Sequence, residues 1–382
     1  MMRLDELQRR VKEITTAITP VSDDLVVIAP WKAEEVPRLI EHCLSCETPL
    51  VVGNGVLSAG VRFDLSKLQK IKPDETSLVV HVEAGVTLGH LEEKLHTYGL
   101  TLGPIPGELR EHSVGGAIAG RSYFKLGRYF SYWEDPLLSL DVILPNGNYY
   151  HTTPAPRRAA GPDLTKLLAG SEGTLGIIMS ARLRVYTRTR SAREAVWHLP
   201  TLQAAGLAAR KLLRAGLCCS VLYAEEHPGK ALLGARLEGS MASLHDARLQ
   251  EAEALLGPTQ LDPHALIQRL LAPQKDLPTP RAEILVPYEE VSAVLALCPE
   301  RSAATLTAKL PEVALLWLEG VSPVKLFTLA RAHHGTASPA SALYEAGTQF
   351  GASTLGAAYA SLRSMKQHLD PQHLFAKGAL GL

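Results

Sequence analysis

Glycine clusters in the first half of the chain are the residues whose spacing could do chemistry. The first follows the apolar segment 50–52 and runs from Gly53 to Gly60. Closely spaced backbone N–H groups in such a turn can bind a phosphate. The spacing does not match the dinucleotide motif G-x-G-x-x-G, and segment 61–68 is strand-like where a nucleotide-binding Rossmann unit needs a helix. The cluster is therefore either a phosphate-binding loop or a hairpin or bulge turn.

Two further clusters follow along the chain. The second contains Pro106 and Gly107 and continues over residues 113–120, and the third runs over residues 170–178. Adjacent glycines between small residues let a backbone approach a flat ligand closely. Each cluster alone could serve packing. Three of them within one domain are harder to explain by packing alone.

The elements that must position these clusters alternate between strands and helices. Apolar runs predict strands, helical spacing of apolar residues predicts helices, and Asn146-Gly147 favours a tight hairpin turn. Pro37 is tolerable in a helix only because it falls in the first turn. We predict strands at 25–29, 49–52, 78–82 and 176–186, a hairpin of 138–144 with 149–152, and helices at 33–44 and 88–95.

The second half of the chain has a different order of predicted strands and helices, and we place a domain boundary near residue 190. Segments 194–199, 202–214, 220–224, 231–237 and 242–256 read as strand, helix, strand, strand, helix, and the order repeats loosely through residues 282–338. This is the order of a ferredoxin-like α+β sandwich. A last helix over 352–369 has an apolar face, so we expect it to dock on the rest of the chain.

Composition bounds the function. The chain has 382 residues, with 39 basic and 39 acidic side chains and a net charge of +0, which argues against a nucleic-acid binder. Apolar residues make up 46%, enough for a sizeable core. The charged start, MMRLDELQRRVKEI, is not a signal peptide, and no apolar run is long enough to cross a membrane. Few cysteines indicate a reducing compartment, so we expect a soluble, cytoplasmic protein, held at the inner membrane only through partners.

In this order, the clusters resemble the FAD-binding domain of the vanillyl-alcohol oxidase / p-cresol methylhydroxylase (PCMH-type) superfamily. The most specific segment is GPDLTKLLAGSEGTLGII, and VEAGVTLGHLEEKLHTYGL and DPLLSLDVILPNG are also similar. The ending LDPQHLFAKGAL resembles the terminal "LDP…NPGK" of FAD-linked oxidases. Length and ending are most similar to FAD-binding subunits of glycolate oxidases. The resemblance implies an α+β fold: a two-part FAD-binding domain at 1–190, a ferredoxin-like cap at 191–345, and a C-terminal helical segment at 346–382 that returns to the FAD domain.

The resemblance also implies a role for each glycine cluster. The first would wrap the FAD pyrophosphate, the second would line the flavin and ribityl side, and the third would hold the remaining cofactor through main-chain groups. FAD needs many N–H donors, little net positive charge, and small residues beside its flat ring. The cofactor-binding residues implied are Gly53, Asn54, Gly55, Val56, Leu57, Ser58, Pro106, Gly107, Ser113, Val114, Gly115, Gly116, Glu172, Gly173, Gly176, Ile177 and Ile178.

The chain departs from the family pattern in its first loop. Val56 and Leu57 stand where the family usually has Thr and Ser, so two hydroxyl donors are lost, with Ser58 as a substitute. No histidine lies in this loop, and no cysteine lies in any of the clusters. We therefore expect FAD to be bound non-covalently.

The implied activity is FAD-dependent oxidation of a 2-hydroxy acid such as glycolate or D-lactate, with hydride transfer to flavin N5 and electron transfer to a partner. The partners implied are a larger flavin subunit and an iron–sulfur subunit. The alternative is a non-catalytic FAD-binding or assembly subunit, favoured by the altered first loop and by the absence of the metal-binding motif H-x-G-D-G-N-x-H of larger relatives. A third reading is an independent flavin enzyme with another substrate. No catalytic residue and no metal ligand can be assigned.

Several other side chains have both a structural and a functional explanation. His112 precedes the second cluster, and the pair His333-His334 is more often surface or packing than a metal site. Arg157-Arg158 is either a solvated basic loop or a carboxylate or phosphate clamp. Residues 123–133 form an aromatic and basic segment, either a substrate or partner loop or a surface turn.

The spacing of Cys43 and Cys46 is C-x-x-C, but a second cysteine pair at suitable spacing is absent. Zinc or an iron–sulfur cluster is therefore unexpected. Cys43 falls on the apolar face of its helix, which favours core packing.

Overall fold

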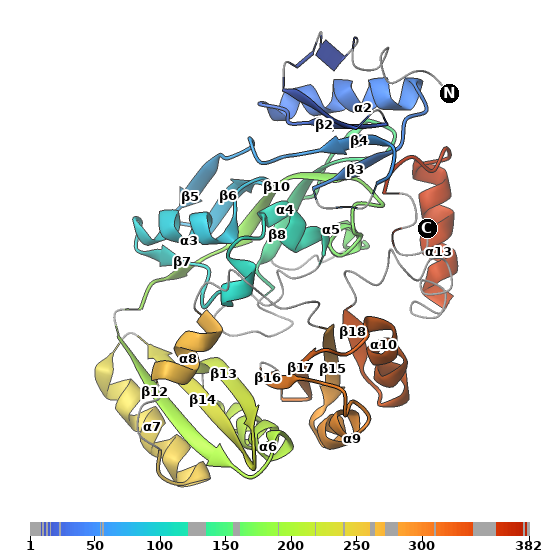
Figure 1. Cartoon of the computed structure of the whole chain (residues 1–382). Coiled ribbons are helices and arrows are strands. Elements are labelled where there is room, and N and C mark those ends of the chain that lie inside the picture. Colours follow the sequence, from blue (N-terminus) through green and yellow to red (C-terminus); the bar gives the residue numbers. More distant parts are fainter. Residues whose placement is uncertain are drawn as a thin grey trace.

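The computed structural model of this chain is a mixed α/β fold (Figure 1). It describes residues 9, 11–12, 14–15, 17–22, 24–53, 55, 57–120, 135–155, 161–189, 191–217, 219–239, 241–259, 264–271, 282–308, 311–338, 357–376 and 379. Three candidate groups from the sequence lie outside these residues: Asn54 and Val56, the segment 123–133, and Arg157-Arg158.

The first sheet has the order β1-β2-β4-β3. Strand β2 (Leu25–Ile28) pairs in parallel with β4 (Gly60–Phe63), which pairs in parallel with β3 (Leu50–Val52), while β1 (Ile18–Ser22) is antiparallel to β2. The crossover from β2 to β3 is η1 (Ala33–Glu35) followed by α2 (Val36–Ser45). Pro37 lies in the first turn of α2, and the buried residues recur at helical spacing, which confirms the predicted helix.

The second sheet is antiparallel, in the order β5-β6-β10-β8-β9. The predicted hairpin is confirmed, because β8 (Leu137–Ile143) pairs with β9 (Tyr149–His151). One face of the sheet packs on helices α3 (Leu88–His96) and α4 (Val114–Ala119), whose apolar residues share one core with it (Figure 1). The remaining strands are β5 (Ile71–Asp74), β6 (Val79–Glu83) and β10 (Ile177–Arg184).

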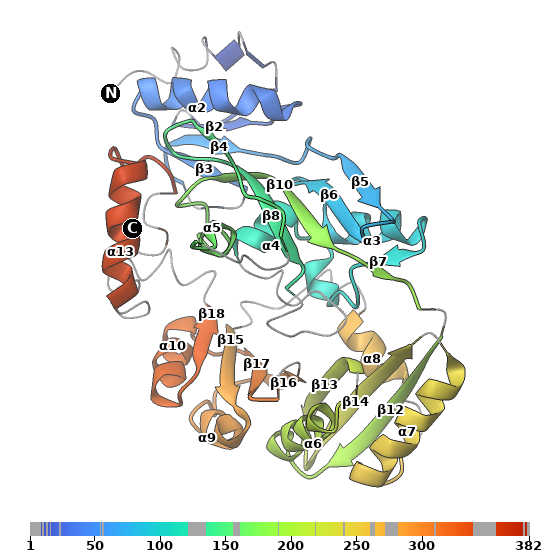
Figure 2. The same cartoon turned by 180° about the vertical axis from the view of Figure 1, so that it is seen from behind.

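Short elements complete this half of the chain. Strand β7 (Leu100–Thr101) pairs with β11 (Tyr186–Thr187), and η2 (Gly107–Leu109) and α5 (Leu164–Leu168) precede the second and third glycine clusters. Leu362, Met365 and Leu369 of α13 (Ala357–Leu369) pack against the core of this half of the chain, and from behind the helix lies on the side of α5 (Figure 2). Of the helix expected over 352–369, the part from Ala357 onward is described.

A separate sheet follows residue 190, in the order β12-β14-β13-β16-β17-β15-β18. Its second part runs β15 (Ala282–Pro287), α9 (Val291–Ala296) after η5 (Tyr288–Glu290), β16 (Ala303–Ala308), β17 (Val313–Glu319), α10 (Pro323–Ala332) and β18 (Thr336–Ser338). The spatial order β16-β17-β15-β18 is that of a ferredoxin-like βαββαβ unit. The loose repeat seen in the sequence is therefore a repeat of topology.

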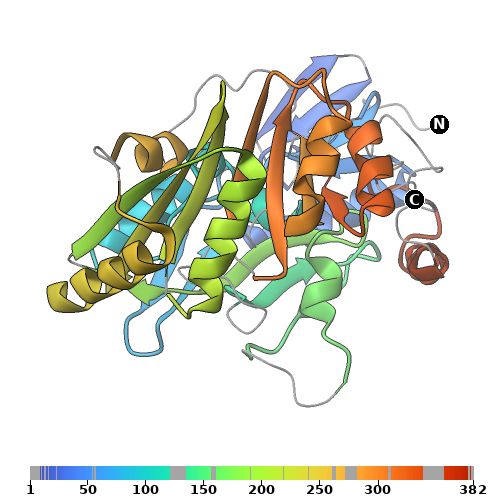
Figure 3. The ribbon, with the colours of Figure 1, turned by 90° about the horizontal axis from the view of Figure 1, so that it is seen from below.

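The first part of this sheet has the same order without a closing strand among its described residues. It runs β12 (Ser191–Leu199), α6 (Leu202–Arg214), β13 (Cys219–His227), β14 (Lys230–Gly239), α7 (Ala242–Leu256) and α8 (His264–Leu271). The two parts join where β13 pairs with β16. Helices α6, α9 and α10 cover the face seen from below (Figure 3), and α8 lies between the sheet and η2.

Candidate cofactor site

The first glycine loop connects two parallel strands. A hairpin joins antiparallel strands, whereas β3 and β4 are parallel. The hairpin alternative for this loop is therefore wrong. The Gly53 N–H donates to the Phe63 carbonyl at 2.8 Å, which ties the start of the loop to the end of β4. Gly53 has a φ of +62° and open space where a Cβ would stand. Its backbone is therefore free to be approached by a ligand.

The rest of the first loop is partly accessible. Gly55 donates to the Val52 carbonyl at 3.4 Å, Leu57 is half-buried and Ser58 is exposed. At its far end, a Cβ on Gly60 would lie 2.1 Å from the Pro49 carbonyl oxygen. Gly60 is thus required by packing, whereas Ser58 presents its hydroxyl outward.

The second cluster forms the start of α4. Ser113 caps this helix, since its Oγ accepts from the Gly116 N–H at 3.1 Å. A Cβ on Gly115 would lie 2.8 Å from the Cβ of Ala84, so Gly115 serves the contact of α4 with the end of β6. On the side where a Cβ would stand, Gly115 therefore faces Ala84 and not open space. Gly116 is exposed, and a Cβ there would lie 3.1 Å from Ser113 Oγ.

The buried carboxylate of Glu92 binds residues 101 and 102, which precede the second glycine cluster. Pro106 and Gly107 are buried at the start of η2. Glu92 of α3 accepts from the Thr101 hydroxyl and, at 2.8 Å, from the Leu102 N–H. Sequence reasoning missed Glu92, although a glutamate among the buried leucines of an amphipathic helix is a visible signal.

The third cluster contains left-handed backbone at two adjacent positions. Glu172 has a φ of +51° and Gly173 a φ of +76°. A Cβ on Gly176 would lie 2.7 Å from the Ile143 carbonyl oxygen, so this glycine lets β10 approach β8. Ile177 and Ile178 are buried at the start of β10.

Glu172 carries an isolated carboxyl group. Burial raises its pKa to about 7. Among the described residues, this side chain has no hydrogen-bond or ion-pair partner. At neutral pH about half of these carboxyl groups are therefore protonated. The region beside Gly173 is then less negative than with a fully ionised carboxylate, which favours an anionic ligand.

Backbone hydrogen bonds bring the second and third clusters together. The Gly170 N–H donates to the Ile118 carbonyl at 3.0 Å, and the Glu172 N–H donates to the Ala119 carbonyl at 3.1 Å. The end of α4 is thereby fixed to the third loop. Residues separated by some fifty positions in the sequence thus share one region of the molecule.

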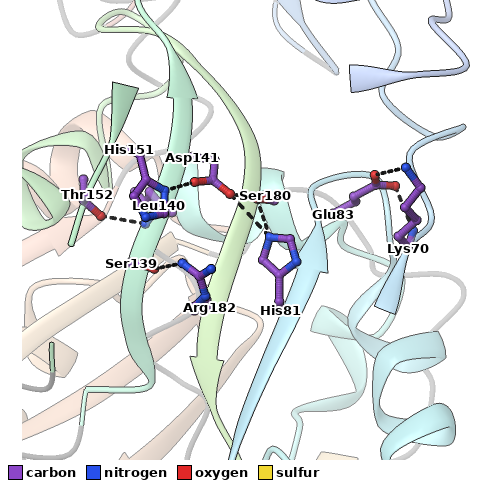
Figure 4. Close-up of polar contacts among 10 residues, drawn as sticks. All are labelled: Lys70, His81, Glu83, Ser139, Leu140, Asp141, His151, Thr152, Ser180 and Arg182. Carbon is purple, nitrogen blue, oxygen red and sulfur yellow. Dashed lines mark hydrogen bonds and ion pairs between the residues drawn. The ribbon is translucent and has the colours of Figure 1, made fainter. Parts of the chain in front are cut away.

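The second sheet carries a cluster of Ser, His and Asp side chains, which are the residue types of a hydrolase triad (Figure 4). The Asp141 carboxylate accepts from Ser180 Oγ and from His151 Nδ1, while His81 Nε2 lies 2.9 Å from Ser180 Oγ. The same nitrogen of His81 lies 3.4 Å from Asp141 Oδ2. A Ser-His-Asp triad needs the two partners on different ring nitrogens, so this cluster is not one.

The cluster instead joins neighbouring strands β6, β10, β8 and β9 through partly buried polar contacts. Burial alone would raise the pKa of Asp141, but hydrogen bonds from His81, Ser180 and His151 lower it below its ordinary value. The carboxylate therefore stays ionised at neutral pH.

Other candidates receive structural explanations. His333 Nδ1 lies 2.7 Å from Glu290 Oε2, which accounts for one member of the histidine pair. Cys43 is fully buried in the core, as its place on the helix predicted, and burial raises the pKa of its thiol to about 12. Within the described ranges, no His, Cys, Asp or Glu side chains cluster as a metal site. No helix in that part of the chain is long and apolar enough to span a membrane.

The arrangement fits an FAD molecule. Gly53, Gly116 and Gly173 have an open backbone side, apart from Ser113 Oγ near Gly116 and the Ala376 Cβ at 3.9 Å from Gly173. Such backbones accept flat rings and phosphates at close range. Small residues and main-chain donors, rather than a cluster of cations, are the donor set that a phosphorylated flavin requires.

The comparisons with known proteins agree with this fit. Residues 25–153 match the family model described as an FAD binding domain. The mitochondrial D-lactate dehydrogenase (cytochrome) of Arabidopsis thaliana is 34% identical over 205 residues, which are 50% of this chain and 35% of that protein. The glycolate oxidase subunit GlcD of Bacillus subtilis is 26% identical over 213 residues, 53% of this chain and 45% of that protein. These matches therefore span less than half of each relative.

A solved structure shares the fold over a longer stretch. An alkyldihydroxyacetonephosphate synthase superposes with a TM-score of 0.69 at 16% identity, covering 92% of this chain and 76% of that one. At this identity the likeness concerns the fold. It extends beyond residues 25–153 into the second half of the chain.

Proposed function

We propose that this chain, a member of the PCMH-type FAD-linked oxidases, is an FAD-dependent oxidoreductase acting on a small 2-hydroxy acid such as D-lactate or glycolate. The observation that carries the proposal is that the first two glycine clusters lie within the match to an FAD binding domain over residues 25–153, and that backbone hydrogen bonds join the third cluster to the second. The names of the curated relatives support the substrate class.

The proposed cofactor contacts are based on which glycines leave space beside the backbone and which pack against other residues. Gly53, Gly55 and Ser58 would contact the pyrophosphate, with Asn54, Val56 and Leu57 completing the loop. Gly116 would lie against the flat ring, supported by Pro106, Gly107, Ser113, Val114 and Gly115. Gly173 would offer its main chain, while Glu172, Gly176, Ile177 and Ile178 shape that loop.

Bound FAD would supply the two-electron oxidation. A 2-hydroxy acid carries a carboxylate and a hydroxyl, so the chain must supply a cation for the first and a proton acceptor for the second. From sequence alone, Arg157 and Arg158 are the candidates for the carboxylate.

We propose that the electrons then leave to another protein, since the cysteines of this chain do not form a cluster-binding motif. A larger flavin subunit and an iron–sulfur subunit are the proposed partners, in the cytoplasm or at the inner face of a membrane. In the alternative function, the same FAD would serve a non-catalytic or assembly subunit of such a complex.

An absorption spectrum of the purified protein tests the cofactor directly. We expect flavin bands that move to the supernatant after acid precipitation, as for non-covalent FAD. Bands that stay in the pellet would contradict the non-covalent assignment. A colourless protein that does not take up added FAD would refute the proposed function.

Anaerobic titration of the holoprotein then tests the substrate class. We expect D-lactate or glycolate to bleach the flavin, with L-lactate and acetate as controls for stereochemistry and for the hydroxyl group. A flavin reduced by dithionite but by no 2-hydroxy acid, alone or with the proposed partner subunits, would favour the non-catalytic alternative.

A further inference from the structure

A lysine is completely buried in the C-terminal helix α13. Lys366 is 1% exposed, and its Nζ lies 2.6 Å from Asp370 Oδ2. The same ammonium donates to the Thr174 carbonyl at 2.8 Å and to the Phe375 carbonyl at 2.7 Å. A lysine has three N–H donors, so all of them are used. One of these acceptors, Thr174, belongs to the third glycine cluster.

Asp370 shapes the chain that follows the helix. Its carboxylate accepts from the Leu374 N–H and from the Phe375 N–H, each at 3.0 Å. The turn that results includes a left-handed residue at Ala376, with a φ of +42°. We call Lys366, Asp370 and residues 374–376 the C-terminal clasp.

The C-terminal clasp also holds the strand that leads into the first glycine loop. The Leu50 N–H donates to the Leu374 carbonyl, and the Ala376 N–H donates to the Leu50 carbonyl, both at 2.8 Å. Phe375 thereby forms a parallel bridge with Leu50 at the edge of the first sheet. Strand β3 ends at Val52, directly before Gly53.

We propose that Lys366 is a positioning residue of the cofactor site, which fixes the first and third glycine clusters to each other through the C-terminal clasp. The inference rests on the proposed FAD binding and deepens it. A ligand that contacts both clusters binds better when they are already ordered, so docking of the C-terminal clasp and FAD binding are coupled. Such coupling is reciprocal, and bound FAD must in turn hold the C-terminal clasp in place.

The first experiment uses the apoprotein. Lys366→Met removes the ammonium, and Lys366→Met/Asp370→Asn also removes the charge left behind while keeping one of the two acceptor oxygens that the N–H groups of residues 374 and 375 use. We expect faster amide hydrogen exchange in peptides covering residues 50–53 and 172–176. Arg363→Met, on the exposed side of the same helix, is the matched control. It should leave the exchange rates of both groups of peptides unchanged.

The second experiment titrates FAD and follows flavin fluorescence. We expect Kd to rise about tenfold or more in both Lys366 variants, with partial rescue by Lys366→Arg. Leu326→Ala, in the core of the other half of the chain, controls for general loss of stability and should change Kd less than twofold. FAD should slow exchange in residues 366–376 of the wild type.

The outcomes separate this inference from the proposed function. Unchanged exchange at both glycine clusters, or an unchanged Kd in a folded double variant, would overturn the role of Lys366. An equal rise in Kd for Leu326→Ala would overturn it too, because the effect would then be general. A wild type that binds no FAD refutes the proposed function, and the exchange data on the apoprotein still decide whether Lys366 positions the clusters.

Discussion

Glu172 combines an unusual backbone conformation with a carboxyl group whose pKa is raised. Its backbone is left-handed, its N–H donates to the Ala119 carbonyl at the end of α4, and its half-buried side chain has no partner among the described residues. Desolvation disfavours the charged form, which raises its pKa to about 7. Near neutral pH this one side chain therefore changes the charge of the proposed FAD site.

The raised pKa makes a prediction about the apoprotein. The unfolded carboxyl titrates near 4.5 and the folded one near 7, so stability present below pH 4.5 is lost as the pH rises toward 7. Glu172→Gln removes this loss. We expect the variant to gain about 2 kcal/mol over the wild type between pH 5 and pH 8, measured by urea unfolding. Glu93→Gln, at an exposed carboxylate, should show no such gain, and parallel pH curves for Glu172→Gln would contradict the burial of this group.

At the scale of elements, a polar cluster links neighbouring strands of the second sheet in addition to its apolar packing. Asp141 lies opposite both Ser180 of β10 and His151 of β9, and His81 of β6 reaches the same carboxylate across β10 (Figure 4). Cross-strand pairs of this kind stabilise a sheet in its register. The sheet in turn carries Gly176 and the third cluster at the start of β10.

The prediction for this cluster is a pH-dependent loss of stability. Its hydrogen bonds keep the folded pKa of Asp141 below the ordinary 3.8, so its stabilisation is present above that pH and is lost as the pH falls through the folded pKa. We expect Asp141→Asn to cost about 1–3 kcal/mol at pH 7 and progressively less below pH 4, measured by denaturant unfolding. Asp246→Asn, at a carboxylate that is 53% exposed, is the control. An equal cost at pH 7 and at pH 3 would show that the charge is irrelevant.

At the scale of the whole molecule, the chain forms separate hydrophobic cores. One gathers residues from Val11 to Val185 together with Leu374 and Phe375, and the other gathers residues from Ala195 to Ala330. The change of core coincides with the proposed boundary near residue 190. We propose that residues 1–190 with 346–382 form the FAD-binding unit and that residues 191–345 form a cap.

Separate cores predict separate responses to FAD. At a hundredfold excess over Kd, FAD should stabilise its own unit by roughly 2.7 kcal/mol, which raises that melting temperature by about 5–10 °C. Trp197 and Trp317 are buried in the seven-stranded sheet that follows residue 190, so the fluorescence of these two side chains reports on the cap. We expect calorimetry with FAD to show one shifted transition, while the midpoint of the tryptophan signal stays in place. A single transition that shifts as a whole would contradict independent units.

Much of this protein is determined by its sequence. Helical spacing of Val36, Leu39 and Ile40 and the Asn146-Gly147 turn are local signals, and local sterics and apolar burial decide them without distant contacts. The glycine clusters and the family resemblance predicted FAD binding from local sequence as well, because a short motif determines the backbone geometry that a ligand contacts. The order of elements after residue 190 even contained the ferredoxin-like repeat.

Only the tertiary structure decided how these pieces meet. Strand direction is set by a partner elsewhere in the chain, so the parallel pairing of β3 with β4 could not be read from the loop between them. The reason for Gly115 became visible only beside Ala84. The spacing of Lys366 and Asp370 fits an ordinary exposed helix pair, although Lys366 adjoins the apolar Met365 and Leu369. Its burial depends on Thr174, 192 positions earlier, because only folding brings that carbonyl to the ammonium.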